Sequence, residues 1–125
     1  MVYDREIFIE NKIHEMEEIT ENNSYDLYRT IALIGDVFSS PYIRTPIVSI
    51  DAVRRLWSVM SQAFFCFDEY EKRFEIVSVM NDIFLYAKEQ NVDLNVDGLS
   101  AWRKKHLNDP LAQEIVEYID NILTL

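Results

Sequence analysis

The chain has few of the residues that interrupt regular structure, with two glycines and three prolines among its 125 residues. Gly35 and Gly98 stand far apart, so the clustered glycines of a phosphate-binding loop are missing. The one cysteine, Cys66, cannot form a disulfide within the chain. Because it lies between Phe65 and Phe67, we expect a small buried hydrophobe there and not a reactive thiol.

Histidine is equally scarce, which limits metal and acid–base chemistry. The only two histidines are His14 and His106, and neither has a second ligand at a spacing specific for a metal site. No catalytic motif accompanies them. We therefore expect no catalytic residues, no bound metal and no cofactor, and a protein that is not an enzyme.

One stretch partly matches a calcium-binding loop. Asp93, Asn95 and Asp97 alternate before Gly98, as in the first half of an EF-hand. The second half does not match, because its last ligand position is Lys104 instead of a bidentate glutamate. We favour a helix-capping turn, and whether Asp93, Asn95 and Asp97 bind a cation stays open.

Long hydrophobic runs are also absent, since no stretch of about 18 residues is both apolar and uncharged. The first residues contain no basic region followed by an apolar one, so we expect neither export nor membrane insertion, and a cytoplasmic protein. Hydrophobic residues make up 49% of the chain and aromatic residues 13%, more than in a disordered acidic tail. The length fits one folded domain, residues 1–125.

Apolar residues recur at three- and four-residue spacing along the whole chain, which indicates helices. The pattern predicts an all-α fold, a single-domain irregular bundle of five or six helices. The fourth helix, apolar around most of its circumference, is expected to lie at the centre. The expected helices cover about residues 4–21, 24–35 with Ser24 as cap, 49–67 starting at Ser49 or Asp51, 68–90, a short segment through Trp102, and 109–125 starting at Asp109-Pro110.

The stretch 36–49 is predicted to be an irregular loop, because Pro41 and Pro46 disfavour helix at the residues before them. It is nevertheless hydrophobic, with Phe38, Tyr42 and Ile47 among its members. We favour a lid that lies across the bundle, and a partner-binding loop is the alternative.

Charge is the most unusual property of the sequence: 22 acidic residues against 12 basic ones, a formal net charge of −10. At 100° per residue, Glu6, Glu10, Glu17 and Glu21 fall within an arc of about 60° on the first predicted helix. A solvated helix face explains one such stripe, but like charges four residues apart oppose helix formation. A second acidic group follows at residues 68–71, and a third on the last helix. We expect a partner-binding surface made of Glu6, Glu10, Glu17, Glu21, Tyr42, Asp68, Glu69, Tyr70 and Glu71.

A charge of this sign disfavours direct contact with nucleic acid or anionic lipid and favours a basic protein partner. In length, charge, helical content and lack of a catalytic motif, the chain resembles bacterial immunity proteins that neutralise nuclease toxins, those of contact-dependent growth-inhibition systems in particular. The resemblance implies a one-to-one complex with a cognate toxin domain, an RNase or a DNase, inside the producing cell.

Two other functions remain open. A phage or plasmid protein that mimics nucleic acid, and so inhibits a defence or DNA-binding protein, would have a similar charge. A helical adaptor or regulatory subunit would instead have a pocket for a small ligand or a partner helix, lined by Trp57, Tyr86 or Trp102.

Overall fold

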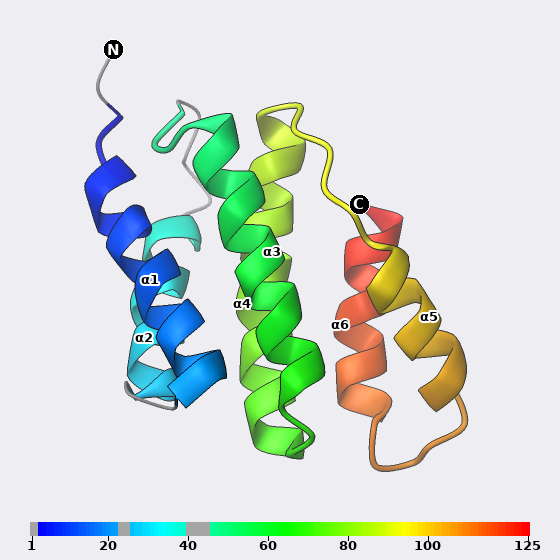
Figure 1. Ribbon diagram of the computed structural model, residues 1–125. Coiled ribbons are helices and arrows are strands. Elements are labelled where there is room, and N and C mark those ends of the chain that lie inside the picture. Colours follow the sequence, from blue (N-terminus) through cyan, green and yellow to red (C-terminus); the bar gives the residue numbers. More distant parts are fainter. Residues whose placement is uncertain (1–2, 23–25, 40–45) are drawn as a thin grey trace.

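The computed structural model describes residues 3–22, 26–39 and 46–125, and this part of the chain is all-helical, as the sequence predicts (Figure 1). It contains no β-strand. None of its helices is both long enough and apolar enough to cross a bilayer. The helices are α1 (Glu6–Asn22), α2 (Leu27–Phe38), α3 (Ile50–Cys66), α4 (Tyr70–Glu89), α5 (Asp97–His106) and α6 (Gln113–Thr124).

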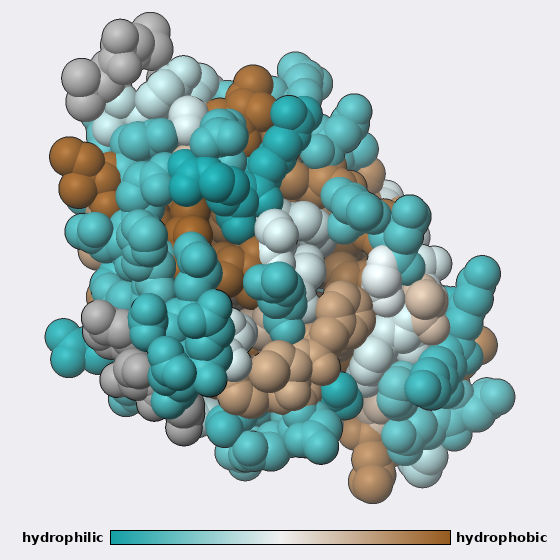
Figure 2. Space-filling view, in the orientation of Figure 1, coloured by the Kyte–Doolittle hydropathy of each residue, from teal (hydrophilic) through white to brown (hydrophobic). Residues whose placement is uncertain are grey.

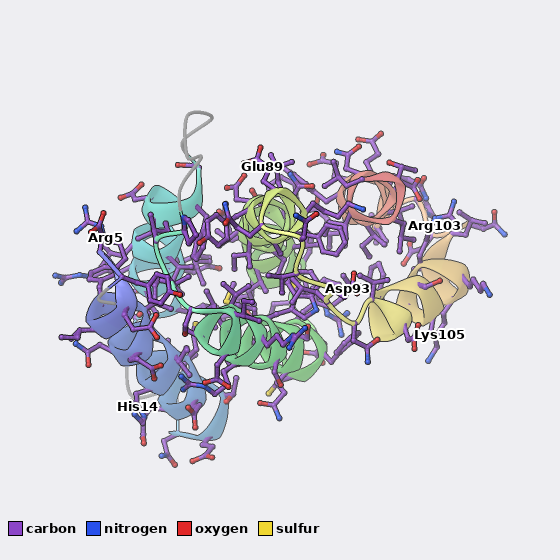
Figure 3. All side chains as sticks on the ribbon, turned by 90° about the horizontal axis from the view of Figure 1, so that it is seen from above. Arg5, His14, Glu89, Asp93, Arg103 and Lys105 are labelled. Carbon is purple, nitrogen blue, oxygen red and sulfur yellow. The ribbon has the colours of Figure 1, made fainter. Side chains whose placement is uncertain are left out.

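The six helices form three consecutive hairpins that stand side by side. Helices α1, α3 and α5 make one layer, and α2, α4 and α6 make the layer behind it (Figures 1 and 3). In the second layer α4 packs against both of its neighbours, α2 and α6, and it also packs against α3. In the first layer α1 packs along α3, whereas α3 and α5 share few contacts. The front layer is therefore less closed than the back one.

Helix α4 lies at the centre, as predicted, and the core is built around it. Ile76, Val77 and Met80 are fully buried. Helix α3 contributes the apolar row that its spacing predicts, with Leu56 and Met60 among its fully buried members. These side chains form one continuous hydrophobic core, so burial of apolar surface holds the three hairpins together.

Helix α2 does not end near Gly35 as predicted but continues to Phe38. Glycine within a helix costs about 1 kcal/mol relative to alanine. Phe38 is buried, with its ring 5.2 Å from that of Tyr86, and burying such a side chain contributes about 1.5–3 kcal/mol. Packing therefore outweighs the glycine. The start of α2 is capped by Asp26, and the predicted cap, Ser24, lies outside the described residues.

A break separates α3 from α4 at residues 67–69, a point that the sequence alone does not decide. Phe67 is extended, and its N–H donates to the carbonyl of Ala63 at 3.1 Å. Arg73 reaches back from α4, and its Nε donates to the carbonyl of Phe64 at 3.2 Å. The side chain of Arg73 thus satisfies a carbonyl at the C-terminus of α3, where intrahelical partners end.

The last two helices differ from the prediction. Helix α5 runs to His106, beyond Trp102. Helix α6 begins at Gln113 instead of Asp109-Pro110, because Asp109 closes a turn: its Oδ1 accepts the N–H of Leu111 at 3.0 Å. Leu111, which falls inside the predicted range of the last helix, consequently lies before α6 and is 81% exposed.

Residues 46–49, the described part of the hydrophobic stretch just before α3, are anchored to the bundle. The N–H groups of Ile47 and Val48 donate to the hydroxyl of Tyr86 at 2.9 and 3.4 Å, and Val48 is buried. These contacts agree with a lid over the bundle. Tyr42, a predicted partner-binding residue, lies outside the described residues. Helix α3 then begins after Ser49, one of the two predicted starts, and the hydroxyl of Ser49 caps it.

Candidate functional site

Glu6 and Glu10, the first half of the predicted stripe, are used inside the fold. The carboxylate of Glu6 accepts both the N–H and the hydroxyl of Ser49, each at 2.7 Å. Since Ser49 is the cap of α3, Glu6 fixes the start of α1 to the start of α3. Charge-assisted bonds of this kind are roughly twice as strong as neutral ones, so Glu6 has a structural role.

Glu10 forms a bidentate ion pair with Arg55, which also binds Asp51 at 2.8 Å. The hydrogen bonds from this guanidinium hold the pKa of Glu10 below its usual range. The two carboxylates in turn raise the pKa of Arg55. Glu10 is therefore neutralised by its own protein and offers a partner little free charge.

The second half of the stripe is different. Its members Glu17 and Glu21 are exposed on the last turns of α1, as is Glu18, which was not part of the predicted stripe. No ion pair between described residues includes these three, and Glu18 accepts a hydrogen bond from Nδ2 of Asn22 at 3.0 Å. The last turn of α1 has no basic residue, although a helix C-terminus is the negative end of the helix dipole. These three glutamates, hereafter the α1 acidic turn, thus stand where the helix itself disfavours them.

The second predicted group, residues 68–71, stands where a helix favours acids. Asp68 and Glu69 precede α4, and Glu71 lies in its first turn, at the positive end of the dipole. Glu69 also pairs with Lys72 at 3.0 Å. Helix stability therefore explains part of this group.

Tyr70, the predicted aromatic anchor of that group, is 40% exposed. Its ring is stacked on Phe74, with the centroids 6.0 Å apart. Partial burial, together with the carboxylate of Glu114 from α6, raises the pKa of Tyr70. One face of the ring is thus held by the protein while the rest is accessible.

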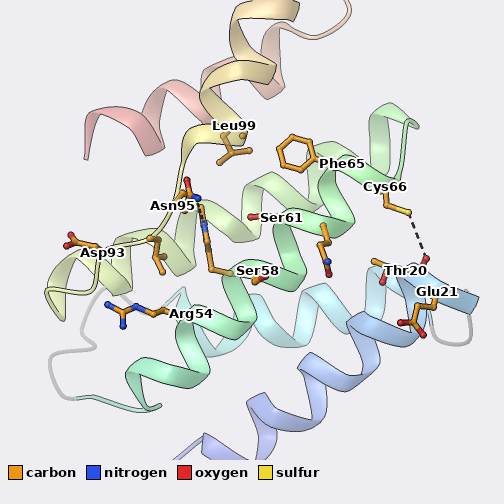
Figure 4. Close-up of a pocket in the computed structure, with 14 residues that line it drawn as sticks. Thr20, Glu21, Arg54, Ser58, Ser61, Phe65, Cys66, Asp93, Asn95 and Leu99 are labelled. Carbon is orange, nitrogen blue, oxygen red and sulfur yellow. Dashed lines mark hydrogen bonds between the residues drawn. The ribbon is translucent and has the colours of Figure 1, made fainter.

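The fold brings the α1 acidic turn to the same end of the molecule as Asp68. Thr20 is the link, because its carbonyl accepts a hydrogen bond from Sγ of Cys66, 3.9 Å away, at the end of α3 (Figure 4). Cys66 is exposed there, not buried as predicted. A helix turns only one side to the core, and in the run of residues 64–67 that side belongs to Phe64.

Three basic residues form a cluster on α5. Arg103, Lys104 and Lys105 belong to the last turn of α5, where they complement the dipole, and Arg103 pairs with Asp120. Figure 3 places Arg103 and Lys105 at one edge of the bundle and α1 at the opposite edge. This basic cluster therefore lies apart from the α1 acidic turn, while other basic residues, such as Lys12 and Arg55, pair with acids on α1.

An open groove of about 950 Å³ crosses the outward face of α3, between the end of α1 and the start of α5 (Figure 4). In Figure 2, which faces the layer of α1, α3 and α5, hydrophobic side chains reach the surface between hydrophilic ones. The groove, hereafter the α3 groove, is lined by Thr20, Glu21, Arg54, Trp57, Ser58, Ser61, Gln62, Phe65, Cys66, Asp93, Leu94, Asn95, Gly98 and Leu99.

Sequence reasoning missed the α3 groove because it depends on how far α5 stands from α3. The sequence signal was the row of polar and small residues on α3, which includes Ser58 and Ser61 and ends at Phe65. In the structure, Phe65 is 42% exposed. Gly98 sets the closest approach of α5, since a Cβ there would lie 2.9 Å from the ring of Phe65. The contact between Phe65 and Gly98 cannot be read from the sequence, because the two residues lie on different helices.

The EF-hand-like stretch forms the far wall of the α3 groove. Oδ1 of Asn95 accepts the N–H of Asp97 at 2.9 Å, and its carbonyl accepts the indole N–H of Trp57 at 2.8 Å. Asn95 thus forms a polar turn immediately before α5, but the N-cap position of α5 is Val96, which makes no side-chain cap hydrogen bond. Asp93 points away from Asn95 (Figure 4). In the described ranges, no group of three His, Cys, Asp or Glu side chains is placed to hold a metal ion.

Of the three aromatic residues proposed for an adaptor pocket, Trp57 lines the α3 groove and the other two belong to the core. Tyr86 binds the chain before α3, as described above, and Trp102 packs edge-on against Phe64, with ring centroids 5.2 Å apart. Comparisons of the chain with protein-family models, with curated proteins and with solved structures found no match.

Proposed function

We propose that this protein is an immunity protein, which binds a basic toxin domain through its acidic surface and so neutralises it in the cytoplasm of the producing cell. A nuclease is the preferred target, because a cleft that holds phosphate is positively charged and carboxylates can cover it. The protein acts by binding and performs no catalysis itself.

The α1 acidic turn is the observation that carries the proposal. Glu17 and Glu21 are four residues apart on one helix face, and such like-charged pairs destabilise a helix by about 0.2–0.5 kcal/mol. Their place at the negative end of the helix dipole adds to that cost. Glu6 and Glu10 have partners within the fold, whereas Glu17 and Glu21 are in no ion pair between described residues. A cationic partner supplies the missing compensation.

The charge distribution supports the same function at longer range. With a net charge of −10 and its basic cluster at the opposite edge, the molecule has a field that attracts a cationic protein and orients it toward the acidic end. Such steering raises association rates by about 10- to 1000-fold and weakens as salt is added.

The test is a triple variant, Glu17→Gln, Glu18→Gln and Glu21→Gln, compared with a control that removes the same charge elsewhere. The control is Asp4→Asn, Asp36→Asn and Glu89→Gln, three exposed acids outside the α1 acidic turn. The partner is first captured from the native host. We expect the triple variant of the α1 acidic turn to associate with it about tenfold more slowly than the unmodified protein at low salt. The control should associate less than about threefold more slowly. Stopped-flow mixing measures both rates.

Equal slowing by the two triple variants would mean that net charge alone steers association, and the α1 acidic turn would lose its role. Capture of an acidic partner would remove the proposal altogether.

The adaptor alternative is favoured by one observation, the α3 groove with Trp57 in its floor. A cavity of this volume lies within the range of ligand sites, about 300–1000 Å³. Thermal unfolding in the presence of small apolar compounds separates the two functions, since a dedicated ligand site raises the melting temperature and an immunity protein shows no such dependence.

A further inference from the structure

The α3 groove exists because the front layer of the bundle is incomplete. Helix α1 covers one flank of α3, but α5 packs mainly on α6, so a strip of α3 between them stays open. Ser58 and Gln62 on this strip are exposed. A segment from another molecule can therefore reach α3 without moving any helix.

The floor of the groove is apolar. Trp57 and Leu99 are almost completely buried beneath it, and Leu94 and Phe65 form its sides. Phe65 is 42% exposed at the edge of this floor. A large apolar side chain placed here would remove Phe65 from water and gain contact with the floor.

The rims of the groove are acidic on both sides. Glu21, with Glu17 one turn before it, lies on the α1 side, and Asp93, with Asp97 after it, lies on the α5 side. Arg54 is the one basic residue among the described residues that line the groove. An apolar floor between two acidic rims complements a segment in which an apolar residue is flanked by cations.

We propose that the α3 groove receives a peptide segment of the basic partner, with a large apolar side chain over Trp57 and Leu99 and with arginine or lysine facing Glu21 and Asp93. The inference rests on the proposed function, because it assigns a place on the molecule to the same partner. A second copy of this chain is disfavoured as the occupant, since each copy carries a net charge of −10.

A peptide probe tests the groove without the partner. The probe is a short acetylated and amidated peptide with a central tryptophan between two arginines, and its counterpart has glutamates in their place. Amide chemical shifts of the full chain are followed by NMR at low salt. We expect the cationic peptide to shift the signals of Ser58, Ser61 and Gln62 and the acidic peptide to leave them unchanged.

Two variants show whether the groove itself is the site. Ser58→Trp fills the groove from an exposed position on α3, and Ala101→Trp adds the same side chain at an exposed position outside the groove. We expect the first to weaken binding of the cationic peptide at least about tenfold and the second to leave it unchanged. Melting curves verify that both variants are folded.

Arg54→Glu provides a gain-of-function test that does not depend on blocking the site. It removes the cation from the groove and should tighten binding of the cationic peptide about three- to tenfold. The control is Arg29→Glu, which changes the net charge equally at an exposed position on α2 and should have less than about a twofold effect.

Equal binding of both peptides, undiminished binding by Ser58→Trp, or equal effects of the two arginine variants would overturn the inference. Those results leave the proposed function standing, because its own test uses the captured partner and the α1 acidic turn. If instead the cationic peptide binds as expected but the captured partner is acidic, the proposed function fails while the groove keeps its specificity for cationic segments.

Discussion

At the scale of single residues, the same side chain has different roles at different positions. Glu6 binds the cap of α3 and Glu10 binds Arg55, whereas Glu17 and Glu21 face solvent. The helical wheel places all four on one arc, and that prediction is geometrically sound. It does not show which of them meet a donor, since Ser49 and Arg55 lie more than forty residues away in the sequence.

Asp82 gives a prediction at this scale, because burial on α4 raises its pKa. A carboxyl group whose pKa is higher in the folded than in the unfolded chain stabilises the fold while it is protonated. That contribution is lost as the pH rises through the folded-state pKa. Asp82→Asn should therefore increase the free energy of unfolding at pH 7, by less than about 1 kcal/mol, and the increase should diminish toward acidic pH.

Urea unfolding from acidic pH up to pH 7 measures how Asp82→Asn changes the free energy of unfolding. Asp36→Asn, at an exposed position on α2, is the matched control for the loss of one negative charge. A gain from Asp82→Asn that does not vary with pH, or that Asp36→Asn reproduces in full, would contradict the role given to burial.

At the scale of helices, their existence follows from apolar spacing, while their ends depend on tertiary contacts. The start of α3 was predicted to within two residues, as Ser49 or Asp51, because the cap is local. The end of α2 was misplaced because Phe38 packs on Tyr86, and the start of α6 because Asp109 closes a turn. The α3 groove could not be predicted, since the spacing of α3 and α5 is set by the packing of whole hairpins.

The junction of α1 with α3 yields a prediction about element pairing. Glu6→Ala removes both bonds to Ser49 and should lower the free energy of unfolding by about 1–3 kcal/mol, because two partly buried, charge-assisted hydrogen bonds are lost and the cap loses its support. Glu17→Ala changes the same residue type at an exposed position on the same helix and should change stability by less than about 0.5 kcal/mol. Chemical denaturation of the two variants measures the difference, and equal losses would mean that the junction contributes nothing.

At the scale of the whole molecule, two features coincide at one end of the first layer. Glu17 and Glu21, which are in no ion pair between described residues, lie on the last turns of α1, and the opening of the α3 groove begins beside them at Thr20 and Glu21. The basic residues of α5 lie at the other edge. A cationic partner approaching along this field meets the acidic turn first and the groove next.

The salt dependence of association with the captured partner tests the central claim most directly. The rate constant is measured by stopped-flow mixing of the unmodified protein at two ionic strengths, about 0.01 M and about 0.15 M, between which the screening length falls from about 30 to about 8 Å. An acidic surface that steers a basic partner predicts an association rate that falls at least about tenfold over this interval, with a smaller change in the dissociation rate. An association rate indifferent to salt would contradict the account.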